Sequence, residues 1–147
     1  MVELNLPSFE YRIKKTEGKI FIFDEIRKKY VFLTPEEWVR QHVVNYMIAH
    51  LQYPRALIRI EGGTRYNTLR KRTDIVVYTR SGAPWMVVEC KAPEHTVGPD
   101  TLRQVSVYNA TLRAHYIAVT NGITTVCASV SSNPNAAKVL SNFPPYD

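Results

Sequence analysis

The stretch R-T-D-I-V-V-Y-T-R-S-G-A-P-W-M-V-V-E-C-K, residues 72–91, decides the fold of this chain. Its two arms are rich in β-branched and aromatic residues, and a Ser-Gly pair lies between them, which predicts a β-hairpin. A turn with Ser81 and Gly82 at its tip fixes the register of the two strands. In that register Asp74 falls directly opposite Glu89, so two carboxylates face each other across the hairpin.

The hairpin gathers three charged side chains on one patch. Side chains alternate between the two faces of a strand, so Glu89 and Lys91 share one face, while Val88 and Cys90 point to the other. Asp74, opposite Glu89, joins them. Facing carboxylates have Cβ atoms about 4.5–5.5 Å apart and repel each other. We therefore expect either a cation between them or a proton on one of them.

These residue types suit a divalent metal ion. Carboxylate oxygens are hard ligands of the kind that Mg²⁺ and Mn²⁺ prefer. We predict that Asp74, Glu89 and the backbone carbonyl of Cys90 bind such an ion, which polarises a phosphoryl oxygen and lowers the pKa of a bound water. Lys91 would orient that water or stabilise charge on the pentacovalent phosphate. The alternative is a surface salt bridge between Lys91 and the acids, which the D-x14-E-x-K spacing taken alone favours.

The charge balance of the chain favours contact with phosphates. The 147 residues carry a net charge of +6, and the isoelectric point is about 9.4. A basic balance of this kind is typical of proteins that bind nucleic acid, although it is weak evidence alone. Four basic residues precede the strand of Asp74: Arg65, Arg70, Lys71 and Arg72. We predict that they bind DNA. The alternative is that they belong to a solvated loop.

Membrane and secretory signals are missing from this sequence. No run approaches the roughly 18 apolar residues of a membrane span, and the first residues lack the pattern of a signal peptide. We therefore expect a cytoplasmic protein with no membrane partner. Cys90 and Cys127 lie in apolar runs without metal-ligand spacing and are interpreted as reduced core thiols. The four histidines are scattered, and we expect them to be structural or exposed.

The remaining elements predict one domain over residues 1–147, with an N-terminal extension or hairpin in residues 1–30 and a core in residues 34–130. Thr34, Pro35 and Glu37 form a helix start with a capping box, and apolar spacing carries that helix to about residue 51. The order of elements predicts an α/β (α+β) fold, a mixed central sheet flanked by helices. The other expected elements are a hairpin at 19–24 and 29–33, strands at 57–61, 116–120 and 123–129, and helices at 99–113 and 135–140.

Four motifs in a fixed order carry a resemblance to a known family. They are L-T-P-E-E-W-V-R-Q at 33–41, R-T-D-I-V-V-Y at 72–78, V-V-E-C-K-A-P at 87–93 and Q-V-S-V-Y at 104–108. Together they resemble the PD-(D/E)xK nuclease superfamily, and most closely the N-terminal nuclease domain of the type I restriction enzyme R subunit. The resemblance covers roughly residues 30–130 and implies a restriction-endonuclease-like fold.

The resemblance also implies a role for each matching residue. Asp74 and Glu89 would be metal ligands and Lys91 the catalytic lysine. The acid on the first helix would be Glu36, which helical phase favours, or Glu37, which forms the capping box. The motif on the second helix consists of Gln104 and Tyr108. The resemblance implies that these two residues help to position the DNA strand or the lysine. The alternative is that they are a pair on the helix surface.

The sequence departs from the family pattern in two places. Thr73 stands where the superfamily name has proline, a variation that leaves the metal chemistry intact. The sequence contains no G-x-x-x-x-G-K-[ST] phosphate loop, so we expect the motor of the R subunit to be absent and a separate motor or specificity subunit to be a possible partner. The leading hypothesis is a Mg²⁺-dependent deoxyribonuclease. The alternatives are a nucleic-acid-binding module and an interaction subunit of a restriction or repair assembly.

Overall fold

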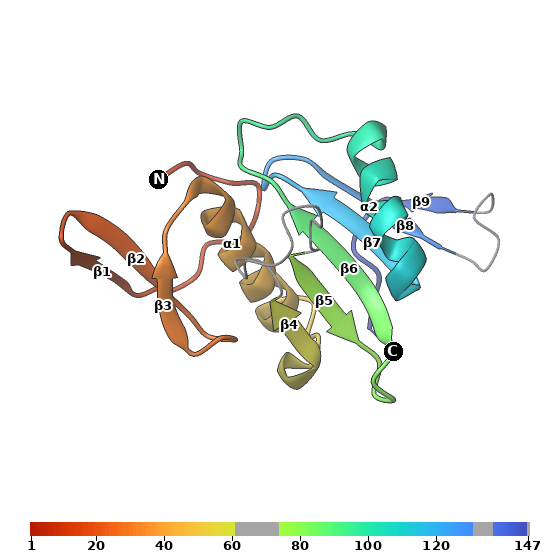
Figure 1. Ribbon diagram of the computed structural model, residues 1–147, viewed down its shortest axis with the longest axis horizontal. Helices are drawn as coiled ribbons and strands as arrows, with labels where there is room; N and C mark the ends of the chain where they lie inside the picture. Colours follow the sequence, from red (N-terminus) through yellow and green to blue (C-terminus); the bar gives the residue numbers. More distant parts are fainter. Residues whose placement is uncertain (61–73, 131–136, 147) are drawn as a thin grey trace.

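The chain folds around a six-stranded sheet that packs between two helices (Figure 1). The computed structural model describes residues 1–60, 74–130 and 137–146, except the side chain of Tyr108. The strand order is β4-β5-β6-β7-β8-β9, and β6 and β7 are parallel while the other neighbours are antiparallel. The predicted mixed α/β class is therefore confirmed. The strands are β4 Ile58–Ile60, β5 Ile75–Tyr78, β6 Pro84–Cys90, β7 Tyr116–Thr120, β8 Thr125–Ser129 and β9 Lys138–Leu140.

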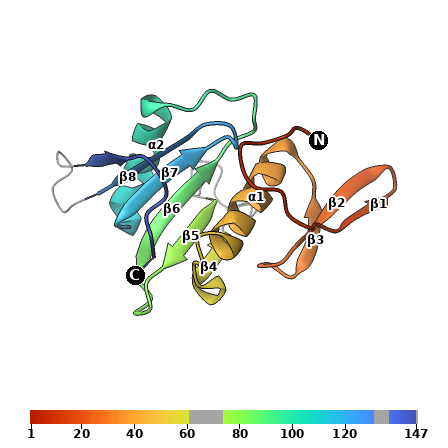
Figure 2. The same cartoon turned by 180° about the vertical axis from the view of Figure 1, so that it is seen from behind.

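The two helices cover opposite faces of this sheet (Figures 1 and 2). Helix α1, Pro35–Ala49, packs against the face that carries Ile75 and Val88. Helix α2, Pro99–Leu112, connects the parallel strands β6 and β7 and packs against the face that carries Val76. A short 3₁₀ helix, Arg55–Leu57, precedes β4. No helix in the described parts of the chain is long and apolar enough to cross a membrane.

The start of α1 agrees with the prediction at Thr34 and Pro35, but not at Glu37. The Thr34 hydroxyl accepts a hydrogen bond from the backbone N–H of Glu37 at 3.0 Å, which caps one of the unpaired donors of the first turn. Pro35 follows at the first helical position. The apolar stripe lies in the core, where Val39 and Met47 have no exposed surface. The side chain of Glu37 differs from a capping-box acid, because it accepts hydrogen bonds from the side chains of Arg27, Arg40 and Gln41 rather than from the Thr34 backbone.

The register of the central hairpin is confirmed along most of its length. Ile75 pairs with Val88, and each following pair keeps the same offset as far as Val77 with Met86. Extended by one residue, from Ile75 back to Asp74 and from Val88 on to Glu89, this offset places Asp74 opposite Glu89. Near the tip the register shifts, and Tyr78 pairs with Pro84 instead of the next residue. A proline has no N–H for the ladder, which is why it occurs where regular pairing ends.

The N-terminal residues form a second, smaller sheet of three antiparallel strands, β1-β2-β3. Strands β2, Lys19–Asp24, and β3, Lys29–Phe32, are the predicted hairpin. Strand β1, Ile13–Thr16, has no counterpart among the predicted elements, because its I-K-K-T sequence is mostly polar and all four residues are exposed. This N-terminal sheet lies beside α1, on the side away from the six-stranded sheet (Figure 1).

The prediction of a short helix at residues 135–140 is wrong in its described part. Residues 138–140 form strand β9, which pairs antiparallel with β8, and residues 135–136 lie outside the described residues. The open edge of β8 offers unpaired backbone groups, and a ladder with that edge satisfies them better than an isolated helical turn does. The chain then returns to the core, where the Tyr146 hydroxyl donates to the carbonyl of Tyr78 at 2.8 Å.

Candidate active site

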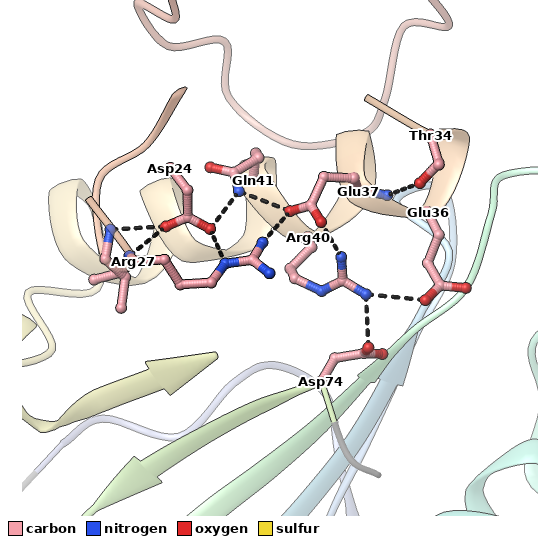
Figure 3. Close-up of polar contacts among 9 residues, drawn as sticks. Asp24, Arg27, Thr34, Glu36, Glu37, Arg40, Gln41 and Asp74 are labelled. Carbon is pink, nitrogen blue, oxygen red and sulfur yellow. Dashed lines mark hydrogen bonds and ion pairs between the residues drawn. The ribbon is translucent and has the colours of Figure 1, made fainter. Parts of the chain in front are cut away.

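Asp74 lies immediately before β5 and is held from two directions. Its Oδ2 accepts a hydrogen bond from the backbone N–H of Cys90 at 2.6 Å, which ties it to β6. Its Oδ1 accepts a hydrogen bond from Nη2 of Arg40 at 2.7 Å, which ties it to α1 (Figure 3). The side chain is buried, and both oxygens have a donor. The cation that we expected near the facing carboxylates is therefore, at Asp74, an arginine of the chain itself.

Arg40 joins three carboxylates and was not among the residues predicted from the sequence. Its Nη1 donates to Glu37 at 2.5 Å, and its Nη2 donates to Glu36 at 2.9 Å as well as to Asp74. The Glu36 and Glu37 contacts follow the i, i+4 and i, i+3 spacing of neighbours on a helix, a signal that the sequence does contain. Burial lowers the pKa of Arg40, but the charges of Asp74 and Glu37 outweigh this effect and raise the pKa above its ordinary value.

The contacts continue from Glu37 into the turn between β2 and β3. Glu37 Oε2 accepts hydrogen bonds from Arg27 and from Gln41, both at 2.8 Å. The same two side chains also donate to Asp24 Oδ2, at 2.6 Å from Arg27 and 3.0 Å from Gln41. We call this set the buried ion chain, drawn in Figure 3; its members are Asp24, Arg27, Glu36, Glu37, Arg40, Gln41 and Asp74. Glu36 is its exposed end, with a side chain that is 48% exposed, whereas the other members are buried or half-buried.

Asp24 forms the far end of the buried ion chain. Its Oδ1 accepts hydrogen bonds from the backbone N–H groups of Ile26 and Arg27, each at 2.8 Å. Burial raises the pKa of the Asp24 carboxyl, but the hydrogen bonds and charge of Arg27, together with Gln41, lower it more, so the pKa lies below its ordinary value. Asp24 is therefore a carboxylate in the folded protein, and it anchors the N-terminal sheet to α1.

Glu89 and Lys91 form the second part of the site, on β6 and just after it. Lys91 Nζ lies 3.4 Å from Glu89 Oε2, and the exposed fractions of the two side chains are 17% and 4%. The backbone N–H of Lys91 donates to the carbonyl of Thr120 on β7, which fixes the end of β6. The expected proximity of the two side chains is therefore observed, although the contact is also what the salt-bridge alternative requires.

The donor types at this site fit a hard cation. The buried ion chain and the Glu89–Lys91 pair together contain five carboxylates. They also contain three basic groups, Arg27, Arg40 and Lys91. Within this described set the acids exceed the bases by two charges, which is the charge of one Mg²⁺. Among the described residues, however, no group of three acidic, histidine or cysteine side chains is arranged so that it could hold a metal ion, and Asp74 is already bound to Arg40.

The structure brings some of the sequence-predicted residues together and leaves others apart. Glu36 and Glu37 both contact Arg40, so both are linked to Asp74. Gln104 is exposed on α2, the helix on the other face of the sheet from α1. The side chain of Tyr108 lies outside the described residues, and so does the basic segment predicted to bind DNA: Arg65, Arg70, Lys71 and Arg72.

The predictions for the cysteine and histidine side chains can be compared with their burial. Cys90 and Cys127 are both buried free thiols, as expected. His42 is buried in α1, where its Nδ1 lies 2.8 Å from the carbonyl oxygen of Trp38, and burial lowers its pKa. The other three histidines, His50, His95 and His115, are exposed. These positions agree with structural or surface roles.

The comparison with known families matches most of this chain. The family model described as Type I restriction enzyme R protein N terminus (HSDR_N) matches residues 35–144, which include α1, the central hairpin and α2. The chain therefore belongs to this family, and the resemblance seen in the sequence is confirmed. The N-terminal sheet precedes the matched region. A search of the curated proteins found no match.

Proposed function

We propose that this chain is a Mg²⁺-dependent deoxyribonuclease domain that hydrolyses phosphodiester bonds, with Mn²⁺ as a second usable ion. The observation that carries the proposal is the excess of two negative charges in the buried ion chain, which runs along α1 to the start of β5. Membership of the R-subunit family supports it, because that family connects the chain with DNA and with the subunits of a restriction complex. The proposal also takes this chain to be one domain, with the N-terminal sheet as its extension.

Each residue of the site has a part in this proposal. Asp74, Glu89 and the backbone carbonyl of Cys90 would bind the ion. A bound divalent ion polarises a phosphoryl oxygen and lowers the pKa of a coordinated water. Lys91, which lies 3.4 Å from Glu89, would hold the attacking water or stabilise the charge that develops on the phosphate. Glu36 or Glu37 would be the additional acid of the first helix.

Arg40 has to release Asp74 before that carboxylate can bind an ion. In the structure, Arg40 supplies the positive charge opposite Asp74, so this one carboxylate has a partner without metal. Its hydrogen bonds to Glu36 and Glu37 use the same guanidinium and do not depend on Asp74. We therefore propose that Arg40 stays on α1 and loses only its contact with Asp74 when the ion binds.

The test is a plasmid-nicking assay with and without Mg²⁺, combined with a calorimetric Mn²⁺ titration. Lys91→Ala should abolish nicking but leave the Mn²⁺ affinity within a few fold, because the carboxylate ligands remain. A matched control is Lys28→Ala, which removes a lysine that is 68% exposed and lies near a glutamate outside the site; it should nick normally. Nicking by Lys91→Ala at the wild-type rate would reject the assignment of this lysine and favour the salt-bridge alternative.

A second function fits one observation and remains the alternative. Both oxygens of Asp74 have donors within the protein, which is what a domain with little cleavage of its own would show. Such a domain would bind nucleic acid or serve as an interaction subunit of a restriction or repair assembly. The Mn²⁺ titration separates the two proposals: an active nuclease takes up the ion, whereas a binding module leaves Asp74 with Arg40.

DNA is the substrate of the proposed nuclease and the ligand of the nucleic-acid-binding alternative. The basic segment at residues 65–72 would contact phosphates, so the affinity for DNA should fall steeply with salt and depend little on sequence. A separate motor or specificity subunit would be the further partner. Fluorescence anisotropy at several salt concentrations measures the dependence, and binding that does not change with salt would contradict a phosphate contact.

A further inference from the structure

The N-terminal sheet has two different faces. Ile22 and Asp24 on β2 have no exposed surface and lie on the face toward α1. Side chains alternate along a strand, so Phe21 and Phe23 lie on the opposite, outer face. The register places Phe32 beside Phe21 and Tyr30 beside Phe23, so four aromatic rings share that face. The ring centroids of these two pairs are 5.9 and 5.2 Å apart.

Basic side chains lie among these rings. The guanidinium of Arg12 is 4.3 Å from the centroid of the Phe23 ring, and Nζ of Lys14 is 4.5 Å from the centroid of the Tyr30 ring. Lys19 lies two residues before Phe21 on β2 and therefore belongs to the same face. The outer face thus alternates aromatic rings with positive charges. We define the aromatic-basic face by these residues: Arg12, Lys14, Lys19, Phe21, Phe23, Tyr30 and Phe32.

The packing of the described residues does not account for this face. The two apolar clusters that form the core, including the half-buried side chains packed against them, contain none of the four rings. Phe32 is 52% exposed. Arg12 forms an ion pair with Glu25 at 3.3 Å, and both side chains are largely exposed. An exposed ion pair of this kind is weak, so an incoming anion can replace Glu25.

The combination of rings and cations selects one kind of ligand. Nucleobases stack on aromatic side chains, while lysine and arginine neutralise the phosphates between them. The base faces are accessible only when the strand is unpaired, because in a duplex they are stacked on each other. We propose that the aromatic-basic face binds single-stranded DNA through base stacking. An acidic protein segment would use the cations but would leave the ring faces uncovered.

The buried ion chain gives this surface a fixed position relative to the candidate active site. Asp24 ends β2 on the inner face of the same sheet, and Arg27 in the following turn bonds both Asp24 and Glu37. The N-terminal sheet is therefore connected to α1 and, through Arg40, to Asp74 (Figure 3). The proposed strand-binding surface does not depend on cleavage and stands whether or not the site hydrolyses DNA.

The experiment measures the anisotropy of fluorescein-labelled DNA titrated with the full chain. The three probes are a 12-nucleotide oligothymidine, a duplex of the same length and a 12-unit abasic strand that has phosphates but no bases. We expect the oligothymidine to bind about tenfold more tightly than the abasic strand, in line with the effect of one or two stacked bases. Equal binding of these two probes would overturn the proposal, because the phosphates alone would then account for the affinity.

Variants test whether the aromatic-basic face of the N-terminal sheet binds the oligothymidine. Phe32→Ala should weaken binding of the oligothymidine about tenfold and change binding of the abasic strand little. Phe32→Trp keeps a ring for stacking and should retain the wild-type affinity, which separates stacking from a loss of folding. Ile20→Ala, a change at a 41% exposed position on the other face of β2, is the matched control and should bind normally.

Two results would reject the assignment of the face to an unpaired strand. One is wild-type affinity of Phe32→Ala for the oligothymidine in a protein whose circular dichroism is unchanged. The other is a polyglutamate peptide that competes with the oligothymidine at equal charge concentration, which would identify an acidic protein segment as the ligand instead.

Discussion

Helices α1 and α2 each carry an arginine paired with an aspartate, but the two pairs lie in opposite surroundings. Arg40 and Asp74 have side chains that are 5% and 6% exposed, and the pair spans from α1 to the start of β5. Arg103 and Asp100 have side chains that are 72% and 92% exposed, and both lie on α2. The same two residue types therefore form part of a buried site in one case and a solvated helix surface in the other. Sequence spacing alone does not reveal which is which.

The difference in burial between the two pairs predicts which charge substitutions will lower the stability of the protein. A buried charge that loses its partner is left without water to solvate it, whereas an exposed charge is solvated at once. Substitutions in the buried ion chain should therefore destabilise the protein, and their counterparts on α2 should not. Matched variants on the two helices test this difference, in order of decreasing effect on stability.

The largest effect is expected for Arg40→Met. The change leaves Asp74 and Glu37 buried without this cation, which should lower the free energy of unfolding by about 3–5 kcal/mol. Urea unfolding followed by circular dichroism measures it, with Arg103→Met on α2 as the control, expected within about 0.5 kcal/mol of the wild type. If Arg40→Met and Arg103→Met had the same free energy of unfolding, the buried pair on α1 would contribute no more to stability than the exposed pair on α2.

A smaller loss is expected for Asp74→Ala. If the facing carboxylates only repelled each other, this change would stabilise the metal-free protein, but the structure reverses that expectation. The variant leaves Arg40 with two carboxylates instead of three and the N–H of Cys90 unpaired, which should cost about 1–3 kcal/mol.

The same variant tests the metal site, because Asp74→Ala should also abolish Mn²⁺ binding and plasmid nicking. Asp100→Ala on α2 should leave stability, ion binding and nicking unchanged, since that carboxylate is exposed. A more stable metal-free Asp74→Ala protein would show that repulsion outweighs the contact with Arg40.

The far end of the buried ion chain should make stability depend on acid pH. The folded-state pKa of Asp24 lies below its ordinary value, so its contribution is complete above about pH 4 and is lost as the pH falls through the folded-state pKa. Asp24→Asn should therefore flatten the fall of the unfolding free energy below about pH 4. Urea titrations between pH 2.5 and 7, roughly the range of folded carboxyl groups, measure this. Parallel curves for the two proteins would contradict it.

The smallest effect on stability is expected for Gln104→Ala. Gln104 is exposed on α2, so the change should stay within about 0.5 kcal/mol of the wild type. Gln41→Ala on α1 is the comparison, because Gln41 is buried between two carboxylates and its loss should cost about 1–3 kcal/mol. If Gln104 positions the DNA strand, its variant should nick more slowly despite normal stability; an unchanged nicking rate would leave it a surface residue.

Much of the architecture could be predicted because its signals are local. The hairpin register follows from a turn and the alternation of residues near it, and the start of α1 follows from a cap within four residues. The strand β9 was interpreted as a helix because three residues carry little pattern, and their pairing partner lies in β8. The exposed strand β1 was missed for the same reason, since only its pairing with β2 reveals it.

The candidate site was predictable in part. Asp74, Glu89 and Lys91 could be proposed as one group from the hairpin register and the family motifs, and the structure places Lys91 beside Glu89 and Arg40 beside Asp74. Arg40 was missed, although Glu36 and Glu37 precede it at helical spacing. Its decisive contact is with a residue 34 positions away, and nothing in the pattern of either segment indicates it.

The sequence by itself determined the hairpin, the capped start of α1 and the charged residue types of the site, because each depends on neighbours a few positions apart. Only the tertiary structure decided that Asp74 is neutralised by Arg40, that Glu37 is buried while Glu36 is exposed, and that the N-terminal sheet is joined to the site. The physical reason is that the strength of a charge contact depends on burial. Burial is set by how distant segments pack, and no local pattern contains that information.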